Sequence, residues 1–126
     1  MTEQPLADSV SWPSLNIVSE KAFNQAVVDT ARRWGWLVYH SWNSQHSAAG
    51  WPDLAMVRDG RLILAELKIG QRKVRPDQEE WLDALRRVGP PVEVKVWRWP
   101  DSWDDIIRTL APKKAIYLNG VLTLAV

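Results

Sequence analysis

Apolar residues recur at helical spacing in two stretches of the chain. Between Ser19 and Gly35 they form one face of a helix, made of Phe23, Ala26, Val27, Ala31 and Trp34. Ser19 is a favourable N-cap and Gly35 a favourable helix end. The second stretch runs from Pro76 to about Val88, with proline at the permitted first position and Gly89 after it. The pattern predicts two amphipathic helices.

Strand patterns lie between and after these helices. Four runs are apolar, β-branched or alternating, at positions 36–42, 53–57, 61–69 and 92–99. Asp59-Gly60 joins the second run to the third as a two-residue hairpin turn. A short helix from about Ser102 to Leu110 follows the fourth run. The last residues, AIYL-NG-VLTLAV, predict a second hairpin.

The order of these elements predicts an α/β fold. It reads α-β-β-β-α-β, with the second long helix crossing over between the third and fourth strands, so we expect a mixed central sheet flanked by helices. We expect three segments: a flexible N-terminal arm at 1–18, a core at 19–110 and an accessory C-terminal hairpin at 111–126.

Length and composition limit the chemistry that is open to the chain. A chain of 126 residues fits one domain with a real core, and without cysteine any metal must be held by oxygen or histidine. The net charge of +1 neither requires nor excludes nucleic acid. Nine tryptophans are too many to be fully interior, so several should line a surface. Without a signal peptide or a membrane span, we expect a cytoplasmic protein, bacterial or in a phage-infected cell.

Charged residues interrupt the predicted hairpin at facing positions. With Asp59-Gly60 as the turn, the register places Asp53 opposite Glu66, with Cβ atoms roughly 5 Å apart. Lys68 projects from the same face of the strand as Glu66. The opposite face is wholly apolar, with Ile63, Ala65, Leu67 and Ile69. Two carboxylates and an ammonium group are therefore predicted to meet in an otherwise buried strand.

This combination suits phosphodiester hydrolysis. Paired carboxylates repel each other, and Mg²⁺ or Mn²⁺, which prefer oxygen ligands, would relieve the repulsion. A bound cation lowers the pKa of a coordinated water and stabilises charge on a phosphate, while a lysine orients or helps deprotonate that water.

Two further polar residues share the apolar faces of the predicted helices. Glu20 precedes the apolar stripe of the first helix, and Gln78 precedes Trp81, Leu82 and Leu85 in the second. Polar groups that point toward a sheet need partners, and the metal centre would supply them. The alternative is that both lie close enough to a helix N-terminus to reach solvent.

These residues resemble a known nuclease family. Four motifs carry the likeness: S-E-K-A-F, G-W-P-D-L, A-E-L-K and P-D-Q-E-E-W-L-D-A-L. Together they resemble the VRR-NUC branch of the PD-(D/E)xK superfamily, found in phage and bacterial single-domain proteins and in larger DNA-repair nucleases. The likeness covers about residues 19–110. It implies a restriction-endonuclease-like core.

The resemblance also implies roles for individual positions. Asp53 and Glu66 would be metal ligands, and Lys68 the catalytic lysine. The others would be Glu20 as the first-helix acidic residue and metal ligand, Leu67 as a ligand through its carbonyl oxygen, and Gln78 as the second-helix glutamine. Arg75 departs from the pattern, because relatives often have a small capping residue before the proline.

Basic residues beside the predicted site are candidates for DNA contacts. Arg72, Lys73 and Arg75 follow the catalytic strand, where they either contact phosphates or belong to a solvated loop. His46 precedes Gly50 and is a weaker candidate for the same role. Arg58 and Arg61, at the far end of the hairpin, we expect to be solubility charges.

The resulting hypothesis is a Mg²⁺- or Mn²⁺-dependent, structure-selective endodeoxyribonuclease. By resemblance it would act as a homodimer on branched DNA such as Holliday junctions, with exposed tryptophans and the terminal hairpin as candidate interface. Three alternatives remain: a flap or nicking nuclease of a phage replication or packaging system, a catalytically inactive nucleic-acid-binding module, and an interaction protein with a tryptophan-rich surface.

Overall fold

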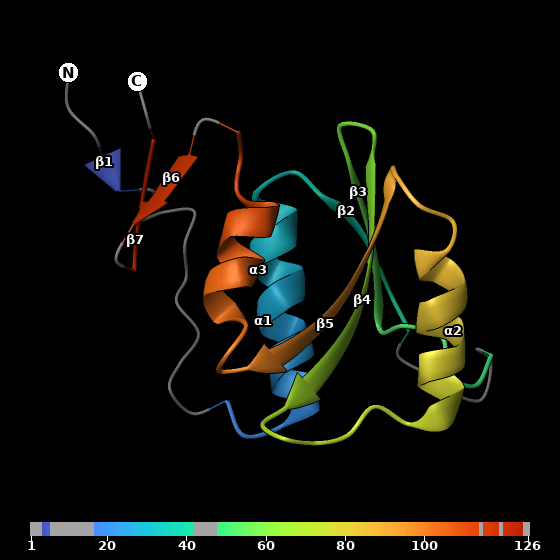
Figure 1. The fold of residues 1–126 in the computed structure, drawn as a ribbon. Coiled ribbons are helices and arrows are strands. Elements are labelled where there is room, and N and C mark those ends of the chain that lie inside the picture. The colour runs from blue at the N-terminus through green and yellow to red at the C-terminus, as the bar shows by residue number, and fades with distance from the viewer. Residues whose placement is uncertain (1–3, 6–16, 42–47, 114, 119, 125–126) are drawn as a thin grey trace.

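The computed structural model describes residues 4–5, 17–41, 48–113, 115–118 and 120–124. Its helices and strands follow the predicted order (Figure 1). The elements are β1 (Gln4–Pro5), α1 (Glu20–Arg33), β2 (Leu37–His40), β3 (Leu54–Arg58), β4 (Arg61–Ile69), α2 (Pro76–Arg86), β5 (Val92–Trp99), α3 (Trp103–Leu110), β6 (Ala115–Leu118) and β7 (Val121–Leu124).

The main sheet is mixed, as predicted. Its strand order is β2-β3-β4-β5, in which β4 and β5 are parallel and the other neighbours antiparallel. Helices α1 and α3 cover one face, and the crossover helix α2 lies on the other (Figure 1). The predicted α/β class, with an αβββαβ core and a terminal hairpin, is confirmed.

Local sequence signals account for the start of α1 and the hairpin turn. The Ser19 hydroxyl accepts a hydrogen bond from the Ala22 N–H at 3.1 Å, as an N-cap should. Asp59 and Gly60 both have positive φ, at 50° and 76°, which matches a tight two-residue turn. Arg58 faces Arg61, so the predicted register is confirmed.

The hydrophobic core lies between the sheet and the α1/α3 layer. From β4 it takes Ile63, Ala65 and Leu67, all fully buried. The intervening residues, including Glu66 and Lys68, therefore face the α2 side. Alternation along one central strand thus separates the core from the charged face.

Two predictions about surface residues are wrong. Arg58 donates hydrogen bonds at 2.8 to 3.1 Å to carbonyl oxygens at the ends of α1 and α3, those of Trp34, Leu110 and Ala111. Arg61 forms two hydrogen bonds of 2.9 Å with Glu93. Both guanidinium groups lie over the Trp36 ring, at 4.6 and 5.2 Å from its centroid. These arginines fasten the hairpin to the helix ends and are not solubility charges.

The described tryptophans divide between the interior and the surface. Trp34, Trp36, Trp97 and Trp103 are buried, and the others that the structure describes are half-buried. Trp12 and Trp42 lie outside the described residues. Four described tryptophans thus belong to the interior, whereas Trp51, Trp81 and Trp99 keep part of their rings at the surface.

The terminal segments meet in a second sheet. β6 and β7 pair as the predicted hairpin, and Gln4–Pro5 pair with Leu124 and Thr123. These two residues belong to the predicted N-terminal arm, whose other residues lie mainly outside the described ranges, so the flexibility of the arm stays a prediction. No helix in the described part of the chain has the length and apolar character needed to cross a membrane.

Candidate active site

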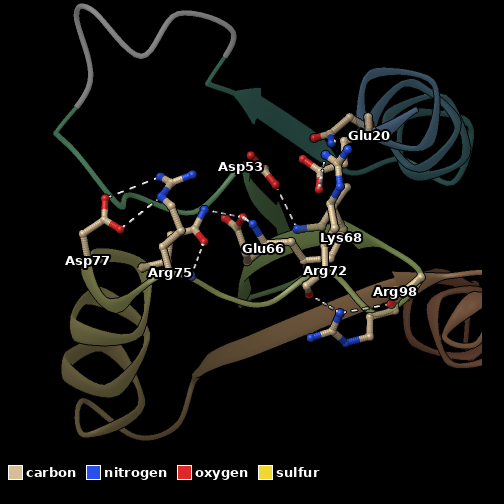
Figure 2. A network of polar contacts seen from close by, with 12 residues as sticks. Glu20, Asp53, Glu66, Lys68, Arg72, Arg75, Asp77 and Arg98 are labelled. Atoms are coloured by element: carbon tan, nitrogen blue, oxygen red, sulfur yellow. Dashed lines mark hydrogen bonds and ion pairs between the residues drawn. The ribbon is translucent and has the colours of Figure 1, made fainter. Parts of the chain in front are cut away.

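Asp53, Glu66 and Lys68 meet on the α2 side of the sheet (Figure 2). Asp53 is the residue immediately before β3, and its carboxylate accepts a hydrogen bond from the Leu67 N–H at 2.8 Å. Lys68 Nζ lies 3.5 Å from Glu66 Oε2, and these two residues are only 5% and 2% exposed. The structure therefore brings together the three residues that the hairpin register predicted.

Gln78 joins this group from α2. Its amide Nε2 donates to Glu66 Oε2 at 2.8 Å, and its Oε1 accepts from the Arg75 N–H at 2.9 Å. Gln78 thus faces the sheet and does not reach into solvent, as the apolar face of its helix indicated. It also caps the helix start from the inside, which compensates for the lack of a small capping side chain at Arg75.

Burial and repulsion shape the electrostatics of the carboxylate pair. Burial, followed by the charge of Asp53, raises the pKa of Glu66 to about 7. Burial also raises the pKa of Asp53, although the hydrogen bond from Leu67 opposes this shift. Glu66 Oε1 is buried and has no hydrogen-bond partner among the described residues. An unpartnered carboxylate oxygen beside a second carboxylate favours a bound cation.

Glu20, the first residue of α1, faces the same space. With Asp53, Glu66, Lys68 and Gln78 it lines a cavity of about 310 Å³, which the 48–51 loop and Arg75 complete. Its carboxylate lies 3.6 Å from the Arg72 guanidinium. Glu20 therefore borders the site, as the helix pattern predicted.

The side chains present fit a divalent cation held by two carboxylates. Within the described ranges, no group of three or more His, Cys, Asp or Glu side chains is placed to hold a metal ion. Asp53 and Glu66 supply hard oxygen donors, whereas Glu20 is not gathered with them into a three-carboxylate cluster. The carbonyl of Leu67 as a further ligand stays a prediction; the Leu67 side chain is buried in the core.

The loop before Asp53 packs closely on the start of α2. Gly50 has φ +88°, and a Cβ atom there would overlap the backbone carbonyl of Asp77. Trp81 Nε1 donates to the Ala49 carbonyl at 3.0 Å, and its ring meets Trp51 edge-on at 5.0 Å. The sequence indicated Gly50 as a turn residue, but this close approach depends on tertiary packing.

Of the predicted DNA contacts, the three basic residues that follow β4 lie at the surface. Arg72, Lys73 and Arg75 are all exposed, and Arg75 also pairs with Asp77 at 3.2 Å. His46 lies outside the described residues. Arg98, which the sequence analysis did not single out, donates to the carbonyl oxygens of Gly70 and Arg72. Arg98 lies beside Lys68 only through the parallel pairing of β4 with β5, so no local sequence signal identifies it.

Comparisons with known proteins do not assign the chain to a family. No family model matches the chain, and no curated protein matches it. One similar solved structure is that of Archaeoglobus fulgidus Hjc, a Holliday junction resolvase from an archaeal hyperthermophile. The identity is 15%, the match covers 81% of this chain and 83% of that one, and the TM-score is 0.47. A likeness this weak carries no argument about function, and membership of the VRR-NUC family stays a prediction.

Proposed function

We propose that the protein is a Mg²⁺- or Mn²⁺-dependent endodeoxyribonuclease that hydrolyses phosphodiester bonds. The observation that carries this proposal is the pairing of half-buried Asp53 with buried Glu66. Lys68 Nζ lies 3.5 Å from the Glu66 carboxylate, and all three residues line one cavity. Burial raises the pKa of both carboxyl groups, and the charge of Asp53 raises that of Glu66 further. Ionising the pair is therefore costly for the fold, so a functional role is a better explanation than a structural one.

Each residue has a defined part in the proposed reaction. Asp53 and Glu66 would hold the cation, which supplies an activated water and neutralises charge on the scissile phosphate. Lys68 would orient an attacking water and stabilise charge on the phosphate. Gln78 fixes one oxygen of Glu66, and the Leu67 N–H fixes one oxygen of Asp53, so both carboxylates have a set orientation in the lining of the cavity.

We propose branched DNA, such as a Holliday junction, as the substrate. This choice is supported by the resemblance of the four motifs to VRR-NUC nucleases and by the exposed cations Arg72, Lys73 and Arg75 beside the cavity. A flap or nicking activity uses the same residues, and the DNA structure that is cut separates the two. An inactive binding module gives no reason to place two carboxylates beside a phosphate path, where they would repel DNA.

We also propose that the protein acts as a homodimer. The described tryptophans offer little area for an interface, because each is buried or half-buried. The uncovered apolar side chains of Leu37 and Tyr39, on strand β2, support the proposal instead, with exposed fractions of 75% and 61%. Val57, the cross-strand partner of Leu37, is also exposed. β2 is an edge strand of the main sheet, and such strands readily pair with another chain.

The proposal is tested by cleavage of labelled four-way junction, flap, nicked and linear duplex DNA with Mg²⁺ or Mn²⁺. We expect the wild type to cut, and Glu66→Ala and Lys68→Ala to lose at least about 100-fold in rate while remaining folded. Glu80→Ala and Lys113→Ala, at exposed positions away from the cavity, are the matched controls. Equal inactivity of wild type and variants toward all four DNAs, with binding retained, would leave the inactive binding module as the better account.

A further inference from the structure

The segment that follows β4 is tied to the neighbouring strand β5. Gly70 N–H donates to the Trp99 carbonyl at 2.9 Å, and Gly70 takes φ +55° as the chain turns away from the sheet. Arg72 N–H then donates to the Ile69 carbonyl at 3.2 Å. The segment is therefore a defined turn that begins two residues after Lys68.

Arg98 completes this attachment from β5. Its Nη1 donates to the carbonyl oxygens of both Gly70 and Arg72 (Figure 2). Arg98 itself is fixed, because it pairs with Lys68 in the β4–β5 ladder and its N–H donates to Ser102 Oγ at 2.8 Å. A hydrogen bond from a charged donor is roughly twice as strong as a neutral one, so this side chain is well suited to hold a turn.

The turn presents the Arg72 side chain beside the candidate active site. The side chain is 72% exposed, and its guanidinium lies 3.6 Å from the carboxylate of Glu20, which lines the same cavity as Asp53 and Glu66. An exposed ion pair of this length contributes little to stability. Arg72 is therefore held near the cavity by its backbone and is available to an anion that approaches from solvent.

We infer that Arg98 is a positioning residue, which holds the turn at Gly70–Arg72 so that Arg72 contacts a DNA phosphate next to the one that is cut. The inference rests on the proposed function for the identity of the anion. It requires that Arg98 acts through Arg72, since the Arg98 guanidinium is directed to backbone carbonyls. A purely structural Arg98 would change stability and leave DNA binding unaltered.

A double-mutant cycle tests this inference. We would measure the affinity of wild type, Arg72→Ala, Arg98→Ala and the double variant for a labelled four-way junction in EDTA at several salt concentrations. Arg86→Ala, an exposed arginine on α2 that pairs with Asp83, is the matched control. Thermal denaturation checks folding, and Arg98→Gln, which keeps an amide donor for one carbonyl, replaces Arg98→Ala if that variant does not fold.

Arg72→Ala should weaken binding on the order of tenfold and reduce the salt slope of log K by about 0.9. Arg98→Ala should reduce the affinity and the salt slope by similar amounts. The double variant should bind no more weakly than either single variant. The inference would be overturned if the two losses of affinity multiplied in the double variant. It would also be overturned if folded Arg98→Ala bound the junction as tightly as the wild type.

Cleavage in Mg²⁺, run in parallel, separates the two proposals. A wild type that binds junctions with the predicted coupling but cuts none would refute the nuclease and leave the role of Arg98 intact. A wild type that cuts junctions, with Arg98→Ala unchanged in KM and salt slope, would refute the role of Arg98 alone. A wild type that neither binds nor cuts DNA would refute both.

Discussion

Glu66 is 2% exposed, and each of its carboxylate oxygens has a different environment. Oε2 accepts from Gln78 and lies beside Lys68 Nζ, whereas Oε1 is buried with no hydrogen-bond partner among the described residues. Burial and the Asp53 charge raise its pKa to about 7. Without metal, ionising Glu66 therefore destabilises the folded protein. The free energy of unfolding should depend on pH for this reason.

Stability without metal should fall as pH rises toward neutrality. The folded protein retains the Glu66 proton up to about pH 7, whereas the unfolded chain releases it near its ordinary pKa of 4.5. The free energy of unfolding should thus decrease by a few kcal/mol between these values and then level off. Urea denaturation in EDTA from pH 4 to 9 measures this. Glu66→Gln should flatten the curve, and an unchanged curve in that variant would contradict the assignment.

Gln78 provides a second test at the same scale. Gln78→Ala removes the hydrogen bonds to Glu66 and to the Arg75 N–H, so we expect a loss of about 1–3 kcal/mol in unfolding free energy and a lower kcat. Gln25→Ala is the control, because Gln25 bonds only to Asp29 on the exposed side of α1 among the contacts described. Equal effects of the two substitutions on kcat would contradict a role for Gln78 in holding Glu66.

At the scale of elements, the start of α2 and the loop before Asp53 act as one unit. The loop touches α2 through Gly50, and Trp81 bonds to the loop carbonyl of Ala49. Gln78 then connects α2 to β4. A displacement of this loop would therefore move both Asp53 and the side chain that orients Glu66.

Gly50→Ala tests this coupling against a matched glycine. Gly89 has a similar φ of +77° but nothing within 4 Å of an added Cβ, so Gly89→Ala should cost only about 1 kcal/mol of backbone strain. Gly50→Ala should lower the free energy of unfolding by at least about 2 kcal/mol and reduce the cleavage rate, because the added Cβ would overlap the Asp77 carbonyl. Chemical denaturation and cleavage rates compare the two. Equal costs would show that the close approach is unimportant.

Local signals predicted the elements, and long-range contacts escaped prediction. Hairpin register follows from the Asp59-Gly60 turn, so the meeting of Asp53 with Glu66 could be read from the chain. The attachment of Arg58 to the ends of α1 and α3 could not, because it joins residues 24 to 53 positions apart in the sequence. The Arg98 contacts depend likewise on the parallel pairing of β4 with β5.

At the scale of the whole molecule, the two faces of the main sheet have separate tasks. The α1/α3 face holds the hydrophobic core, and the α2 face holds the candidate active site. Strand β2 leaves Leu37 and Tyr39 exposed at one edge. This edge is where we place the proposed contact between two copies of the chain.

Polar substitution on this edge should separate the proposed dimer. We expect Leu37→Ser combined with Tyr39→Ser to raise the dimer dissociation constant on the order of tenfold or more, since both apolar side chains would lose burial. Val88→Ser, at an exposed apolar residue just after α2, is the control. Sedimentation equilibrium gives the constants. A monomeric wild type would contradict the homodimer.

The most direct test of the metal centre is titration of the protein with Mn²⁺ by isothermal calorimetry at pH 8, above the pKa of Glu66. The wild type should bind Mn²⁺, Asp53→Asn should weaken that binding at least about tenfold, and Asp83→Asn, at an exposed carboxylate on α2, should leave it unchanged. A wild type that binds no Mn²⁺, or Asp53→Asn that binds it as tightly as wild type, would contradict a metal centre at Asp53 and Glu66.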